Sequence, residues 1–203
     1  MIKIKNIYLS FGDKKIFTDF SLVIKKGEKV LLNAPSGKGK SSLLKIIMGF
    51  VKVDSGEVYI ADKLLSPDNI KEIRAKIAYL PQDIALPKMK VEDFIKSVLA
   101  YESNRKICYC REQVEAMLED LMLPKDTLTQ RTGSLSGGEK QRIGILIMQL
   151  LNREVFLLDE VTSALNSQLK EFITDYFLRM EQTIIVVSHD EVWCQKELRR
   201  VEW

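Results

Sequence analysis

A loop of small and polar residues at 34–42 has the composition and spacing of a phosphate-binding loop. In such a loop, backbone N–H groups surround phosphate oxygens, a lysine reaches the β- and γ-phosphates, and a hydroxyl coordinates Mg²⁺. Lys40 and Ser41 stand at the positions of that lysine and that hydroxyl. The residues that we expect around the phosphates are Ala34, Pro35, Ser36, Gly37, Lys38, Gly39, Lys40, Ser41 and Ser42. The alternative is a glycine-rich turn before a helix.

Two acidic residues, Asp159 and Glu160, follow an unbroken apolar run at 155–158. A strand that ends in this way carries its carboxylates to the carboxyl edge of a parallel sheet, where open α/β folds bind ligands. There Asp159 could hold Mg²⁺, and Glu160 could orient or deprotonate an attacking water. A solvated acidic turn would look the same in the sequence.

A third pattern is Leu-Ser-Gly-Gly-Glu-Lys-Gln-Arg at 135–142. Ser136, Gly137 and Gly138 directly precede a segment with helical character, which predicts an N-cap with exposed amides that could bind an anion. A well-capped surface helix is the plainer interpretation.

The elements that must position these residues alternate between strand and helix. Turn residues separate short apolar runs at 2–7, 20–24 and 29–32, which predicts an N-terminal β region, and further strands are expected at 57–60, 76–80, 155–158 and 183–187. Helical spacing predicts helices over 91–101, 111–121, 137–151 and 167–180. Apolar strands between helices imply a parallel sheet covered on both faces. Residues from about 90 to 134 read as a helical insertion.

Composition excludes several classes of protein. With 203 residues, 46% of them hydrophobic and 29% charged, the chain is long enough to bury a core without disulfides or a structural metal. A net charge of +3 with scattered basic doublets gives no support for nucleic-acid binding. The three cysteines lack metal-ligand spacing, and we expect neither a membrane-spanning segment nor a secretory signal.

These motifs, in their order along the chain, closely resemble those of the ATP-binding cassette (ABC) ATPases. The resemblance covers essentially the whole chain, and residues 135–142 are similar to the family's signature sequence. Further matches are Phe11 as the aromatic against adenine, Gln82 as the Q-loop, residues 155–160 as the Walker B strand, residues 163–166 as the D-loop and His189 as the switch histidine. The implied fold is an α/β P-loop NTPase with a mainly parallel central sheet, an antiparallel β subdomain at the N-terminus and the helical insertion, all in one domain over 1–203.

The resemblance implies an ATPase that uses ATP and Mg²⁺ and whose active site two copies share. In such a homodimer, ATP on Lys40 and Ser41 of one copy is covered by Ser136, Gly137 and Gly138 of the other. Catalytic roles would fall to Glu160, His189 and Gln82, and the metal ligands would be Ser41, Gln82 and Asp159. The expected partner is a polytopic membrane subunit, which would place the chain in the cytoplasm on the inner face of the cell membrane.

The sequence departs from the family pattern at three positions. Ala34 replaces a glycine, Asn166 replaces the usual aspartate of the D-loop, and Ile147 replaces an arginine found in many members. Alanine disfavours positive φ, so we expect slower hydrolysis rather than none. A cassette that binds ATP without hydrolysing it is one alternative.

Within the family, the absence of long apolar segments, coiled-coil or zinc insertions and a second cassette favours the ATP-binding subunit of a transporter. Small export-type cassettes, of the metal-exporter or the lipoprotein and macrolide type, look most similar. The alternative is a soluble or scaffold ATPase of the cell-division or iron–sulfur assembly type that moves no solute. The transported substrate and its direction cannot be read from this chain.

Overall fold

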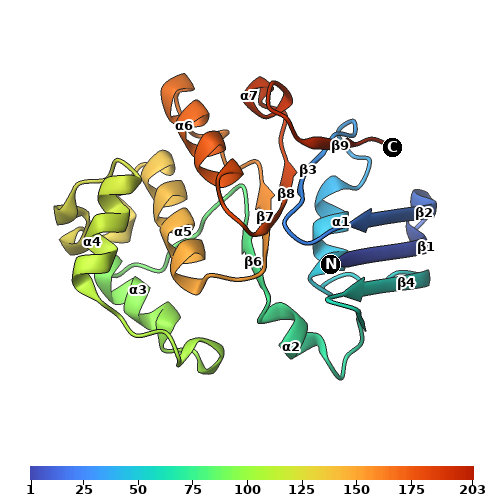
Figure 1. Ribbon diagram of the computed structural model, residues 1–203, viewed down its shortest axis with the longest axis horizontal. Helices are drawn as coiled ribbons and strands as arrows, with labels where there is room; N and C mark the ends of the chain where they lie inside the picture. The colour runs from blue at the N-terminus through green and yellow to red at the C-terminus, as the bar shows by residue number, and fades with distance from the viewer.

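The computed structural model describes residues 1–203 and contains two β-sheets of different kinds. The first sheet is antiparallel, with the strand order β2-β1-β4-β5, and the second is parallel, with the order β6-β7-β8-β3-β9. Figure 1 shows the parallel sheet between the antiparallel sheet on one side and helices α3 and α4 on the other. The fold class predicted from the sequence is confirmed.

The antiparallel sheet is formed by β1 (Ile2–Phe11), β2 (Lys14–Ile24), β4 (Ser55–Ile60) and β5 (Lys63–Leu64). The parallel sheet is formed by β3 (Lys29–Leu32), β6 (Ile77–Leu80), β7 (Val155–Asp159), β8 (Thr183–Val187) and β9 (Arg199–Val201). The second strand was expected from residue 20, but β2 begins six residues earlier, at Lys14. Most of the residues between 14 and 19 are exposed, so this part of the strand shows no apolar run in the sequence.

The helices are α1 (Lys40–Ile47), α2 (Ile70–Arg74), α3 (Val91–Leu99), α4 (Arg111–Asp120), α5 (Gly137–Leu151), α6 (Ser167–Leu178) and α7 (Glu191–Cys194). Three short 3₁₀ helices lie in the insertion, η1 (Glu102–Asn104), η2 (Lys125–Thr129) and η3 (Thr132–Ser134). The sequence did not predict α2, α7, β5 or β9, which are too short for a periodic pattern to develop.

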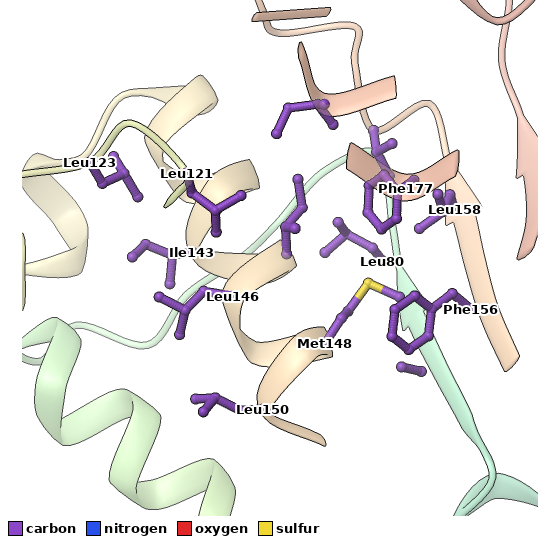
Figure 2. Packing of buried hydrophobic residues seen from close by; sticks show 14 of the residues in the cluster. Leu80, Leu121, Leu123, Ile143, Leu146, Met148, Leu150, Phe156, Leu158 and Phe177 are labelled. Carbon is purple, nitrogen blue, oxygen red and sulfur yellow. The ribbon is translucent and has the colours of Figure 1, made fainter. Parts of the chain in front are cut away.

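The strands of the parallel sheet bury both faces, and successive residues alternate between two hydrophobic cores. On β7, Val155 and Leu157 face the core below the antiparallel sheet and α1, whereas Phe156 and Leu158 face the core under α5 and α6. Figure 2 shows part of the second core, where Met148 of α5 packs near Phe156 and Phe177. Burial on both faces explains why these strands read as unbroken apolar runs.

No helix in the structure is both long enough and apolar enough to span a membrane.

Candidate functional site

The loop between β3 and α1 depends on glycine for its shape. Gly39, which precedes α1, has φ 93°, and a Cβ there would lie 2.4 Å from Cγ2 of Ile16. Gly37 also has a positive φ, whereas Ala34 does not and is buried. Alanine at position 34 therefore meets no conformational penalty, because only positive φ values exclude a side chain. We expected slower hydrolysis because alanine disfavours positive φ, but Ala34 does not have a positive φ, so it gives no reason to expect a distorted loop.

Lys40 begins α1 and reaches back across the loop. Its Nζ donates to the carbonyl oxygens of Ala34 and Pro35 and lies 3.3 Å from Nε2 of His189. The side chain is buried, with only 7% of the residue exposed, and no carboxylate is among the partners of its charge. A buried ammonium whose partners are carbonyl oxygens and a histidine nitrogen, with no carboxylate among them, is a strong binding group for an anion.

A second group of oxygen atoms lies at the end of β7. Asp159 Oδ1 lies 3.5 Å from the hydroxyl of Ser41, and the hydroxyl of Tyr79 on β6 donates to Asp159 Oδ2 at 3.2 Å. Burial, together with the charge of Asp159, raises the pKa of Tyr79 to about 12, so the phenol is a neutral donor at physiological pH.

This donor set fits Mg²⁺. The hydroxyl of Ser41, the carboxylate of Asp159 and the amide of Gln82 face one cavity, and all three present oxygen, the ligand atom that Mg²⁺ prefers. No group of three or more His, Cys, Asp and Glu residues could form a metal cage by itself. Mg²⁺ usually binds through one or two protein oxygens together with substrate phosphates, so a sparse site is what this ion requires.

Glu160 is held in an unusual backbone conformation. Its φ of 52° lies in the left-handed region, and its N–H donates to the carbonyl of Val187 on β8. Its Oε2 accepts from the hydroxyl of Ser188 at 3.4 Å and the N–H of His189 at 3.3 Å. Non-glycine residues in this region store strain and cluster at functional sites. The turn aims the carboxylate across the mouth of the loop, with His189 Nε2 3.8 Å from Oε1.

Most of the predicted site residues line a single open cavity of about 620 Å³. The predicted residues that it brings together are Phe11, Ser36, Gly37, Gly39, Lys40, Ser41, Ser42, Gln82, Asp159, Glu160 and His189. Sequence reasoning missed Lys14, Ile16 and Val187 in its wall. Lys14 pairs with Phe11 across the turn of the β1–β2 hairpin. Once Phe11 is placed at the site, the register of that hairpin is the signal that would have found Lys14.

The remaining residues of the loop lie behind the cavity. Ala34 and Pro35 border a second hollow, of about 630 Å³, together with His189, Glu202 and Trp203. Lys38 turns its carbonyl oxygen outward, where it accepts a hydrogen bond from the indole of Trp203.

The Ser-Gly-Gly residues at 136–138 do not line the cavity of their own chain. Ser136 caps α5 in a capping box with Glu139, and hydrogen bonds from the Ser136 backbone N–H and hydroxyl lower the pKa of Glu139. Ser136 and Gly137 are exposed, and Gly138 is partly exposed. The predicted N-cap is confirmed, and the exposed residues Ser136 and Gly137 lie outside the cavity that the phosphate loop lines.

The D-loop position that departs from the family pattern retains its local role. Asn166 caps α6, and its side-chain oxygen accepts the N–H of Leu169 at 2.9 Å. Aspartate and asparagine cap helices about equally well, so this substitution leaves the start of α6 intact.

Comparison with known proteins gives consistent matches over the whole chain. A family model described as "ABC transporter" matches residues 17–163. The chain is 35% identical to a "Probable ABC transporter ATP-binding/permease protein" of Haemophilus influenzae, over 93% of this chain and 35% of that protein. It is 31% identical to the "Ergothioneine transport ATP-binding protein EgtV" of Helicobacter pylori, over 97% of this chain and 93% of that protein.

Among solved structures, the chain resembles the dimeric post-hydrolysis state of the ATP-binding cassette MJ0796 bound to ADP and Pi. The TM-score is 0.77 at 29% identity, over 94% of this chain and 88% of that chain. Several other curated relatives are longer proteins, of which this chain spans 27% to 52%.

Proposed function

This chain belongs to the ABC transporter family, and from that premise we propose that it binds and hydrolyses ATP with Mg²⁺ to drive a separate membrane subunit. The observation that carries this proposal is the single cavity where Lys40, Asp159, Glu160 and His189 meet. The phosphate loop follows β3, the two carboxylates stand at the end of β7, and His189 follows β8. These residues have no structural task in common. Phosphoryl transfer to water needs all of them in one place.

The loop amides and Lys40 would bind the β- and γ-phosphates, because they supply fixed N–H dipoles and one buried positive charge. Ser41, Asp159 and Gln82 would hold Mg²⁺, which supplies positive charge that neutralises phosphate oxygens. Lys14 lies in the wall of the cavity and adds a second positive charge to it.

Glu160 would orient the attacking water and accept its proton, since its carboxylate is fixed by Ser188 and the backbone of His189. The imidazole of His189 lies beside Lys40 and would donate to the γ-phosphate as charge develops. Phe11, half exposed at the rim, offers a flat apolar surface for the adenine ring.

A second copy of the chain would complete the site. The exposed N-terminus of α5 at Ser136 and Gly137 lies outside its own cavity, and its free amides suit a phosphate on another chain. We therefore assign Ser136, Gly137 and Gly138 to the ATP bound by the partner copy in a head-to-tail homodimer.

Residues 1–203 would act as one cassette, with residues 90–134 as a helical subdomain that meets the membrane subunit. Gln82 also links the cavity to α5, because its backbone carbonyl accepts a hydrogen bond from Nε2 of Gln141 at 3.0 Å. A movement of the backbone at Gln82 would therefore shift Gln141 on α5, the helix that begins at the signature sequence. A membrane partner would hold the chain in the cytoplasm on the inner face of the cell membrane, and the scattered basic residues give no support for nucleic acid as a partner.

Phosphate release from ATP tests the enzymatic part of the proposal. The wild-type chain should release phosphate in a Mg²⁺-dependent manner, and Glu160→Gln should lower the rate by about 10²- to 10⁴-fold, the usual contribution of a general base. The matched control is Glu197→Gln, an exposed glutamate outside the cavity. Equal rates for wild type and Glu160→Gln would contradict the proposed role.

The transport part is tested by the identity of the partner. The tagged chain, purified from native membranes in mild detergent with Mg-ATP, should bring a polytopic membrane protein at about one-to-one stoichiometry. Recovery of soluble proteins alone would favour the scaffold ATPase instead.

A further inference from the structure

The segment after β9 contacts the phosphate loop from outside the cavity, and no role in the proposed reaction accounts for it. Figure 1 shows this end of the chain beyond β9, on the side of the antiparallel sheet. Trp203 lies there, partly buried, against the rings of Phe17 and Phe20 of β2, with centroid distances of 6.0 and 5.2 Å. Its indole N–H donates to the carbonyl oxygen of Lys38 at 2.8 Å.

The same segment also contacts the start of the loop. The N–H of Asn33 donates to the carbonyl of Val201 at 2.9 Å, and the side-chain amide of Asn33 donates to Glu202 at 2.8 Å. Residues 201–203 therefore hold the loop at two points, one before Ala34 and one at Lys38.

The contact at Lys38 bears directly on the phosphate side of the loop. In a planar trans peptide the C=O and the following N–H point in opposite directions. Because the indole of Trp203 holds the Lys38 oxygen, the N–H of Gly39 points in the opposite direction within the same peptide plane. Gly39 lines the cavity and has a φ of 93°. Because glycine has no Cβ, its backbone has few steric restraints of its own.

We propose that Trp203 is a positioning residue for the phosphate loop, which fixes the Lys38–Gly39 peptide so that the Gly39 N–H is ready to bind a nucleotide phosphate. This inference rests on the proposed nucleotide-binding function and extends it to a residue outside the family's motifs. Without the indole donor the peptide can rotate, and part of the binding energy must be used to order it again.

The test is the affinity for ADP, which needs neither hydrolysis nor a second copy of the chain. Trp203→Phe retains an aromatic ring against Phe17 and Phe20 but removes the N–H donor. We expect the dissociation constant of a fluorescent ribose-labelled ADP to rise by about 2- to 10-fold, the range for one hydrogen bond. Tyr109→Phe is the matched control, because it removes an aromatic donor to Glu92 in the helical region.

A purely structural role for Trp203 would lower the thermal midpoint without changing the affinity for ADP, so both are measured for each variant. In steady-state hydrolysis, Trp203→Phe should raise KM for ATP and leave kcat within about twofold, because the groups that act on water are unchanged. If wild type binds ADP and Trp203→Phe binds it equally well, this inference is overturned while the proposed function stands. If the wild-type chain does not bind ADP, both are overturned.

A second measurement needs no variant, so it tests the proposal even if Trp203→Phe fails to fold. In ¹⁵N spectra of the wild-type chain, the indole N–H of Trp203 should shift when ADP binds, because its acceptor is a carbonyl of the loop. The indole of Trp203 is assigned through its contacts with Phe20. An indole resonance that stays unchanged at saturating ADP would overturn the proposal.

Discussion

Two adjacent carboxylates at the end of β7 are held by different donors. Asp159 accepts from the phenol of Tyr79 and lies beside the hydroxyl of Ser41, whereas Glu160 accepts from Ser188 and from the backbone of His189. The backbone also differs, because Asp159 ends the strand β7 whereas Glu160 has a positive φ. These different neighbours support the proposal that Asp159 holds the metal and that Glu160 acts on the attacking water.

Removing the phenol donor should weaken the metal site and leave the fold intact. Tyr79→Phe deletes the hydrogen bond to Asp159 Oδ2, so the carboxylate loses one of the contacts that orient it. We expect the Mg²⁺ concentration for half-maximal hydrolysis to rise by about 10- to 100-fold, the usual effect of removing a hydrogen-bond partner of a metal ligand. A Mg²⁺ titration of phosphate release measures this.

Because burial raises the pKa of Tyr79 to about 12, the phenol keeps its proton, and the effect of Tyr79→Phe should be the same at pH 7 and pH 9. A Mg²⁺ requirement that is unchanged by Tyr79→Phe would show that the phenol does not position Asp159.

Alanine at the start of the phosphate loop should be harmless. Ala34 is buried and does not have a positive φ. Ala34→Gly should therefore leave the affinity for ATP within about twofold and lower the free energy of unfolding by about 0.5–1 kcal/mol, because glycine gains entropy in the unfolded chain. Calorimetric titration and urea denaturation measure the two quantities. A large gain in affinity or in rate would mean that Ala34 distorts the loop.

At the scale of elements, the N-terminus of α5 depends on one carboxylate. Hydrogen bonds from the backbone N–H of Ser136 and then from its hydroxyl hold the pKa of Glu139 below its usual range. The folded pKa is thus lower than the unfolded one, so this stabilisation is present above the unfolded pKa and is lost as the pH falls through the folded pKa.

Replacing that carboxylate should therefore matter at neutral pH and matter less in acid. Glu139→Ala should cost about 1 kcal/mol of unfolding free energy at pH 7, the usual value of a capping interaction, and less as the pH is lowered from 5 to 3. Urea denaturation of wild type and Glu139→Ala at each pH gives the difference. A difference that stays constant down to pH 3 would contradict this account of the cap.

The packing of α5 on the parallel sheet requires a glycine at its centre. A Cβ at Gly144 would lie 2.5 Å from Cδ1 of Leu80 and 2.8 Å from Cδ1 of Ile84. Gly144→Ala should lower the free energy of unfolding by about 1–3 kcal/mol, even though alanine favours helix, because the buried Leu80 must move.

Gly133→Ala is the matched control, because a Cβ at that position meets nothing within 4 Å. If Gly144→Ala has the same free energy of unfolding as wild type, the close packing of α5 against β6 does not require glycine at this position.

At the scale of the whole molecule, the sequence predicted the elements whose residues repeat a buried pattern. The unbroken apolar runs of β7 and β8 and the helical spacing of α5 identified the parallel sheet and its cover. Motifs identified most residues of the cavity because they occur together and in the order of the ABC ATPases, although each motif alone had a plainer interpretation.

Long-range contacts could not be predicted in this way. Lys14, the phenol of Tyr79 and the indole of Trp203 reach the site through strand pairing and packing across many residues. No local pattern distinguishes them from other surface or core residues. The short strand β9, which brings Trp203 to the loop, has three residues and no periodicity to detect.

The assembly of one ATP site from two copies of the chain is tested most directly by sedimentation velocity of the Glu160→Gln variant, which should bind ATP and retain it. We predict that Glu160→Gln is a dimer with ATP and a monomer with ADP. When Ser136→Arg is added, the chain should remain a monomer with ATP, because the N-terminus of α5 then cannot approach the phosphates of the other copy. If Glu160→Gln remains a monomer at saturating ATP, or if Ser136→Arg dimerises equally well, the head-to-tail site is contradicted.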